Sequence, residues 1–169
     1  QIVRVLRPPV LEQLGLKAGL EALIADVQAR TGLRCSLVFE QSHRRGARLP
    51  TLETAFYRIV QELLTNVIRH AHATTVSILV QRNRREWRLT VTDDGVGFDV
   101  DALSPLGGFG LRGIRERAEI LAGQVEISSG VDAGTTVQVR IPVSSTPDRS
   151  AEGRASPGPA SRRRKPVHE

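Results

Sequence analysis

The stretch Gln61 to Ala71 (QELLTNVIRHA) carries a carboxylate, an amide, a guanidinium and an imidazole at spacings that fit one side of a helix. At about 100° per residue, Asn66, Arg69 and His70 fall within roughly 80° of Glu62 around the helix axis. The apolar residues nearby form a separate face, between about 100° and 200°. They are Phe56, Val60, Leu63, Leu64, Val67 and Ala71. We therefore expect a helix with a core face and a chemical face.

A second polar cluster, TDDGVGF at residues 92–98, directly follows an alternating segment typical of a strand. An Asp-Gly pair after a strand is common in ordinary turns. In the functional alternative, the Asp93 carboxylate projects into a cavity and accepts a hydrogen bond from an exocyclic amine. Gly95 and Gly97 would then let a ligand lie close to the backbone. This segment alone leaves both interpretations open.

A glycine-rich segment, GGFGLRG, occupies residues 107–113. Gly108, Gly110 and Gly113 match the G-x-G-x-x-G pattern, but a dinucleotide-binding turn needs a strand immediately before it, and residues 103–106 read as a loop. What remains is a loop entering a helix N-terminus, which favours an anion such as phosphate, or a connection without a ligand. The sequence contains no Walker A motif.

A last pair, Gly134-Thr135, opens the final expected strand. Threonine is a common strand former, so the pair carries no signal by itself. In the functional alternative, the Thr135 hydroxyl completes a polar cluster beside an adenine pocket.

Hydrophobic periodicity predicts the elements that must position these motifs. Helices are expected over residues 16–30, 51–71 and 110–122, a lone strand over 35–40, and hairpins over 76–91 and 125–143. Thr51 is expected to be the N-cap of the second helix, with Thr54 where a capping-box Glu would stand. This order favours an α+β, two-layer sandwich, with a mixed, mostly antiparallel sheet and helices on one face.

Composition sets the domain organisation. The chain has 169 residues, is 40% apolar and carries a formal charge of +6. Residues 144–169 hold six basic and three acidic residues, so half of the excess charge lies in this Pro-, Ser- and Arg-rich tail. We expect the tail to be disordered and residues 16–143 to form one domain. For the basic run at 162–165, contact with nucleic acid or anionic lipid is the alternative to a solvated terminus. We favour the solvated terminus, so no nucleic-acid partner is expected.

Cellular location is inferred from cysteine use and from apolar runs. The single cysteine, Cys35, excludes an internal disulfide and is expected to be a buried strand thiol without chemistry. No apolar run approaches the roughly 18 residues of a membrane span, and no secretory signal opens the chain. We therefore expect a cytoplasmic location. We also expect the chain to be a portion of a longer protein, because it starts at Gln1 and has no methionine. Any membrane contact would come through the parent.

In this order and spacing, the four motifs resemble the ATP-binding domain of sensor histidine kinases, within the superfamily of Hsp90-type chaperones, DNA gyrase and mismatch-repair ATPases. Residues 62–71 resemble the N box, 93–97 the G1 box, 108–110 the G2 box and 134–135 the final Gly-Thr. The resemblance covers about residues 2–143 and implies the two-layer ATP-binding fold of that superfamily.

Three short sequence segments resemble the corresponding segments of the nitrate-sensor-type subfamily of these kinases. That subfamily signals to response regulators with helix-turn-helix outputs. They are RHA at 69–71, DDGVGF at 93–98 and GLRGIRER at 110–117. The opening LRPPVLEQLGL at 6–16 resembles the segment that leaves the second dimerisation helix in such kinases. Residues 1–15 are therefore expected to be the end of that helix and a linker.

The resemblance implies roles for the residues of the helix and of the G1 box. Asn66 would coordinate Mg²⁺ that bridges ATP phosphates, and Glu62 would orient a metal-bound water or assist as base. Arg69 and His70 would face the phosphates. Asp93 would recognise the adenine amino group.

The glycines and the remaining site residues would shape the nucleotide pocket. Gly108 and Gly110 would let a short lid fold over the triphosphate, with Leu111 beside them. Gly95, Gly97 and Thr135 would complete the pocket around the base.

No segment resembles the H box that carries the phosphoacceptor histidine. None of His43, His70, His72 and His168 is placed as an acceptor. The implied function is therefore to donate the γ-phosphate of Mg·ATP to a histidine on the dimerisation domain of a homodimeric parent, for relay to a response regulator. An anti-sigma-type serine kinase and a non-catalytic ATP-binding interaction module remain as alternatives.

Overall fold

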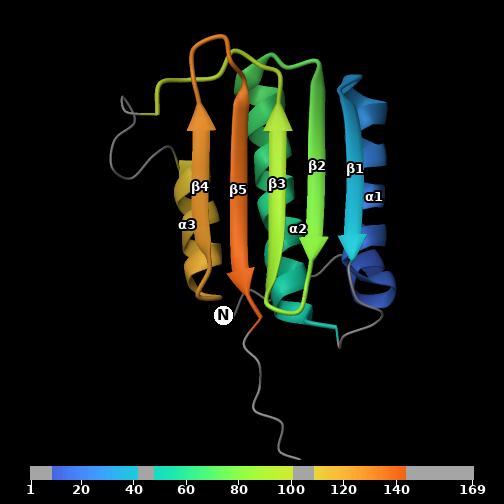
Figure 1. Cartoon of the computed structure of the whole chain (residues 1–169). Helices are drawn as coiled ribbons and strands as arrows, with labels where there is room; N and C mark the ends of the chain where they lie inside the picture. The colour runs from blue at the N-terminus through green and yellow to red at the C-terminus, as the bar shows by residue number, and fades with distance from the viewer. Residues whose placement is uncertain (1–8, 42–47, 101–108, 144–169) are drawn as a thin grey trace, which may run out of the picture.

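In a computed structural model of the chain, residues 9–41, 48–100 and 109–143 are described. Within these ranges, helices lie on one face of a five-stranded sheet (Figure 1). In chain order the elements are α1 (Pro9–Thr31), β1 (Arg34–Gln41), α2 (Pro50–Asn66), the π-helical turn η1 (Val67–Ala71), β2 (Thr75–Arg82), β3 (Glu86–Asp93), α3 (Phe109–Glu119), β4 (Gln124–Ser129) and β5 (Thr135–Pro142). The predicted α+β class and element order are confirmed.

The sheet is mixed, in the order β1-β2-β3-β5-β4. β1 and β2 are parallel because α2 crosses over between them, whereas the other neighbours are antiparallel (Figure 1). Asp93, the last residue of β3, pairs with Thr135, the first residue of β5. The sheet register therefore brings the second and fourth sequence motifs side by side.

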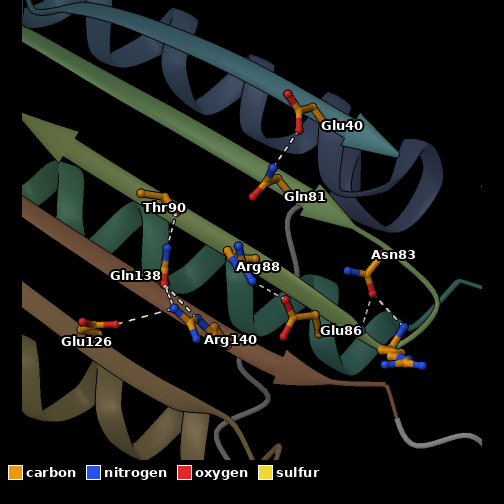
Figure 2. A network of polar contacts seen from close by, with 10 residues as sticks. Glu40, Gln81, Asn83, Glu86, Arg88, Thr90, Glu126, Gln138 and Arg140 are labelled. Carbon is orange, nitrogen blue, oxygen red and sulfur yellow. Dashed lines mark hydrogen bonds and ion pairs between the residues drawn. The ribbon is translucent and has the colours of Figure 1, made fainter. Parts of the chain in front are cut away.

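Alternation along the strands separates a core face from a polar face. Ile78, Leu89 and Val139 point toward the helices and are at most 1% exposed. The opposite face carries a network of polar side chains, including hydrogen bonds from Gln81 to Glu40 and from Gln138 to Thr90 (Figure 2). Because strand side chains alternate with period two, one sequence supplies both faces.

The start of α2 differs from the prediction. The helix begins at Pro50, not after Thr51, and Leu49 occupies the N-cap position without a side-chain hydrogen bond. Proline suits the first turn because its missing N–H would have no helical partner there. The Thr54 hydroxyl donates to the Pro50 carbonyl at 2.7 Å instead of taking part in a capping box. The predicted cap was therefore wrong.

The first helix begins earlier than predicted and is interrupted at Gly15, whose φ is 84°. Leu11, before the break, is buried. The Arg48 guanidinium donates to the carbonyls of Leu11 and Glu12, each at 2.8 Å. It also pairs with the buried Glu53 at 2.8 Å. This polar clamp fixes the segment before Gly15 against the start of α2.

Two smaller expectations changed. α3 ends at Glu119 rather than Ala122, and the chain turns through Ala122 with a φ of 54°. Cys35 is half-buried rather than buried, and burial raises the pKa of its thiol. Gly108, residues 101–107 of the lid expected before it and the tail at 144–169 lie outside the described residues. In the described ranges, no helix combines the length and apolarity that crossing a membrane requires.

Candidate functional site

A cavity of about 510 Å³ is lined by residues of α2, η1, β3, β5 and α3 and of the segment after β3. Figure 1 shows that β3 ends and β5 begins at the upper edge of the sheet. The volume of the cavity is in the range of small-ligand sites. The residues predicted from the motifs that line it are Glu62, Asn66, Arg69, His70, Asp93, Gly97, Gly110, Leu111 and Thr135. Four motifs that are distant in sequence thus contribute to one cavity.

The polar stripe of α2 continues through a π-helical turn that the sequence did not indicate. η1 covers Val67–Ala71, and its C-cap residue is His72, whose φ of 51° lies in the left-handed region. A π-turn holds more residues per turn than an α-helix, so the uniform 100° spacing assumed for the stripe does not apply beyond Asn66. Arg69 and His70 are exposed, yet both line the cavity.

Glu62, Asn66 and Gly110 lie together at one end of the cavity. A Cβ atom on Gly110 would lie 2.5 Å from Glu62 Oε1, 3.0 Å from Asn66 Nδ2 and 3.1 Å from Asn66 Oδ1. Residue 110 therefore packs directly against the Glu62 carboxylate and the Asn66 amide, and the absence of a side chain on Gly110 permits this close approach. Carboxylate and amide oxygens are hard donors that suit Mg²⁺.

The residues at this end fit a Mg²⁺ ion that also takes ligands from phosphates. Among the described residues, no three His, Cys, Asp or Glu side chains cluster as a protein-only metal site. Mg²⁺ commonly binds through one or two protein side chains together with substrate phosphates and water. Glu62 and Asn66 offer such an incomplete set.

Asp93 also lines the cavity and is only 8% exposed. Burial is the main cause that raises the pKa of its carboxyl. Backbone N–H groups of Gly95 and Thr135 oppose this effect, and the Gly95 N–H donates to Asp93 Oδ1 at 2.9 Å. These bonds leave acceptor capacity on the carboxylate for a ligand.

Asp94, the next residue, has a different task. It accepts hydrogen bonds from the Thr74 and Thr75 N–H groups at 2.7 and 2.8 Å, and from the Thr74 hydroxyl at 2.7 Å. These bonds, with that of the Thr75 backbone first, hold the pKa of the Asp94 carboxyl far below its usual range. Asp94 ties the end of β3 to the start of β2, a role the sequence did not indicate.

The two glycines of the G1 segment serve different contacts. A side chain on Gly95 would collide with the Ala71 carbonyl, and the Val96 N–H donates to that carbonyl at 2.8 Å. Gly95 is absent from the described residues that line the cavity, so its observed constraint is the packing against η1. Gly97 lines the cavity and has a φ of 59°. A side chain there would collide with the Gly130 carbonyl.

Sequence reasoning also missed Ser129, the last residue of β4. Its hydroxyl contacts Phe98, Gly134 and Thr135. The available signal was its position in the alternation of β4, where Val125 and Ile127 face the core and Ser129 comes next on the same side.

The chain belongs to the family of histidine kinase-, DNA gyrase B- and HSP90-like ATPases, whose sequence profile matches residues 51–145. It is 38% identical over 141 residues to the sensor histidine kinase MctS of Rhizobium johnstonii, covering 82% of this chain and 30% of that protein. It is 36% identical over 146 residues to an uncharacterised sensor-like histidine kinase of Chloroflexus aurantiacus, covering 83% and 24%. The chain thus spans less than a third of these relatives.

The fold is similar to that of the histidine kinase domain of the Erythrobacter litoralis EL346 blue-light activated histidine kinase. The TM-score is 0.58 at 23% sequence identity, over 75% of this chain and 60% of that domain. The predicted family and fold are confirmed. The nitrate-sensor-type subfamily and the roles of individual residues remain predictions.

Proposed function

We propose that this chain is the ATP-binding catalytic domain of a sensor histidine kinase. It binds Mg·ATP and presents the γ-phosphate to a histidine on the dimerisation domain of a homodimeric parent. The phosphoryl group is then passed from that histidine to a response regulator. The family membership and the names of the two relatives support this proposal. In this proposal the domain is cytoplasmic, and any membrane attachment belongs to the parent.

The observation that carries the proposal is that Asn66 and Asp93 open onto the same cavity. In this proposal the Asp93 carboxylate lies at one end of the cavity, and the pair of Glu62 and Asn66, which packs against Gly110, lies at the other. A nucleotide has the matching polarity, since an amino-bearing base and a metal-bound triphosphate lie at its opposite ends.

At the base end, Asp93 accepts a hydrogen bond from the exocyclic amino group of adenine. The walls beside it are apolar and include Val67, Val91 and Val137, which are at most 5% exposed. Such walls suit the faces of an aromatic ring, and the few polar groups fix its orientation.

At the phosphate end, Glu62 and Asn66 would hold Mg²⁺, which when bound neutralises charge on the phosphate oxygens. Arg69 and His70 add donors from the exposed end of the same helix. The N-terminal turn of α3, which contains Gly110 and Leu111, presents backbone N–H groups that favour an anion. Phosphoryl transfer depends mainly on such positioning and charge stabilisation.

Isothermal titration with Mg·ATP tests the proposal. Asp93→Asn should bind about 5- to 150-fold more weakly than the unsubstituted chain, since losing a buried polar partner costs about 1–3 kcal/mol. Asp132→Asn, at an exposed residue in the β4–β5 turn, is the control and should bind normally. The proposal is wrong if the unsubstituted chain gives no binding heat, or if Asp93→Asn binds as tightly as it does.

A further inference from the structure

Ser129 joins three segments around the base end of the cavity. Its Oγ lies 2.9 Å from the Phe98 nitrogen, 2.9 Å from the Gly134 carbonyl oxygen and 3.0 Å from Thr135 Oγ1. The first contact comes from the segment after β3, and the other two come from the start of β5. One hydroxyl therefore organises the surroundings of Thr135, which lines the cavity.

The direction of each of these hydrogen bonds follows from counting protons. A serine hydroxyl donates one proton and accepts up to two hydrogen bonds. The Gly134 carbonyl can only accept, so the Ser129 proton points to it. The Phe98 N–H can only donate, so it takes one lone pair of Ser129. The remaining contact is then one in which the Thr135 hydroxyl donates to Ser129.

This assignment fixes the chemical character of Thr135. Its only hydroxyl proton is used toward Ser129, so its oxygen can offer only lone pairs to the cavity. Asp93, its partner across the β3–β5 register, also lines the cavity and also offers lone pairs. The base end therefore presents two neighbouring acceptors, which match the two N–H groups of an exocyclic amine.

We propose that Ser129 is a positioning residue that holds the Thr135 hydroxyl as an acceptor, so that the cavity selects bases with an exocyclic amino group over bases with a carbonyl there. This inference rests on the proposed nucleotide binding and extends it to base specificity. Without Ser129, the Thr135 hydroxyl is free to rotate and donate. It can then hydrogen-bond to a base carbonyl, and part of the discrimination is lost.

The test compares ATP with inosine triphosphate, in which a carbonyl replaces the amino group. Titration of the unsubstituted chain with each nucleotide in the presence of Mg²⁺ gives a ratio of dissociation constants. Ser129→Ala should lower the preference for ATP by roughly three- to tenfold, the range expected for one hydrogen bond. Ser129→Thr keeps the hydroxyl and should retain the preference.

A double-mutant cycle separates positioning from a general structural role. In a Thr135→Val background, Ser129→Ala should leave the preference for ATP unchanged, because the hydroxyl that Ser129 orients is absent. Ser129→Cys supplies a second variant of similar size, whose thiol is a weak hydrogen-bonding group and should also lower the preference. It keeps the test open if Ser129→Ala fails to fold.

The outcomes distinguish this inference from the function on which it rests. If the unsubstituted chain binds ATP, and the Ser129 variants that fold weaken both nucleotides equally, Ser129 has only a structural role and the inference is wrong. The inference is also wrong if the Ser129 effect persists in the Thr135→Val background. If the unsubstituted chain binds neither nucleotide, the proposed function itself fails.

Discussion

Two neighbouring carboxylates, Asp93 and Asp94, show how a site is built from single residues. Asp93 is the last residue of β3 and Asp94 is the next, but Asp93 is buried beside a cavity, whereas Asp94 accepts hydrogen bonds from backbone N–H groups. Their pKa values move in opposite directions for this reason. In our account the first recognises a ligand and the second holds the segment that presents the first.

Asp94 should make the free energy of unfolding depend on pH in the acidic range. Because its folded-state pKa is lowered, its contribution is fully present above the unfolded value of about 4 and is lost progressively as the pH falls below it. Asp94→Asn should therefore lower the thermal unfolding midpoint at pH 7, and this difference should shrink at about pH 3. A difference of equal size at both pH values would contradict the assignment. Asp132→Asn should leave the midpoint nearly unchanged.

Gly110 should matter for the metal end of the cavity without mattering for the fold. An added Cβ would lie 2.5 Å from Glu62 Oε1, so Gly110→Ala should displace that carboxylate. We expect the increase in ATP affinity that Mg²⁺ produces to be largely lost, as measured by titration with and without the ion. The unfolding midpoint should not fall, because alanine is the better helix former.

Gly113→Ala is the matched control in the same helix. An added Cβ there would meet only the Arg117 guanidinium, a flexible side-chain end. This variant should keep the Mg²⁺ dependence of the unsubstituted chain. Identical behaviour of the two alanine variants would show that the close packing of Gly110 against Glu62 is not needed for the ion.

At the scale of elements, the clamp formed by Arg48 and Glu53 holds the first turns of α1 against the start of α2. It satisfies the Leu11 and Glu12 carbonyls just before the break at Gly15. Arg48→Ala should increase hydrogen exchange of backbone amides in residues 9–14, since their helical turn loses its link to α2. Nucleotide affinity should not change.

Arg30→Ala provides the comparison, because Arg30 forms an exposed pair with Asp26 at the end of the same helix. Exposed pairs of this kind contribute little, so exchange in residues 9–14 should stay as in the unsubstituted chain. Equal protection of these residues in the Arg48 and Arg30 variants would show that the clamp does not hold the segment.

Hydrophobic periodicity predicted the elements well because burial decides where helices and strands form. It could not predict the start of α2 or the break at Gly15, since these depend on contacts with distant residues such as Arg48. The π-helical turn was missed for the same reason. Its end packs on the G1 segment, where the Val96 N–H bonds to the Ala71 carbonyl.

The candidate site was predictable where several residue types recur at fixed spacing. Asn66 and Asp93 belong to such motifs, and both line the cavity. For Ser129, the alternation of β4 could indicate only which side of the sheet it faces, and its contact with Thr135 depends on how the hairpin folds. Gly95 shows the reverse case, since its motif pointed to a ligand and its contact is with Ala71.

In the whole molecule, the buried core and the candidate site adjoin each other. Helices cover one face of the sheet (Figure 1). The cavity is lined by residues from α2, β3 and β5, among other segments. The chain covers 30% or less of its curated relatives. In the proposed function, the rest of the parent supplies the phosphate acceptor.

The isolated chain should therefore bind Mg·ATP but show negligible autophosphorylation. Incubation with ATP labelled in the γ-phosphate, followed by phosphohistidine detection, measures this directly. Adding a separate dimerisation domain that carries the acceptor histidine should restore labelling on that domain. Labelled histidine on this chain alone would contradict the division of roles.

The most direct test of the central claim is a nuclear magnetic resonance titration of the isotope-labelled chain with Mg·ATP. The account predicts that the backbone amides of Gly95 and Thr135 at the base end, and of Asn66 and Gly110 at the phosphate end, shift along one binding curve. Adenosine alone should shift only the first pair. The claim is contradicted if the two ends respond to ATP with different affinities, or if neither end responds.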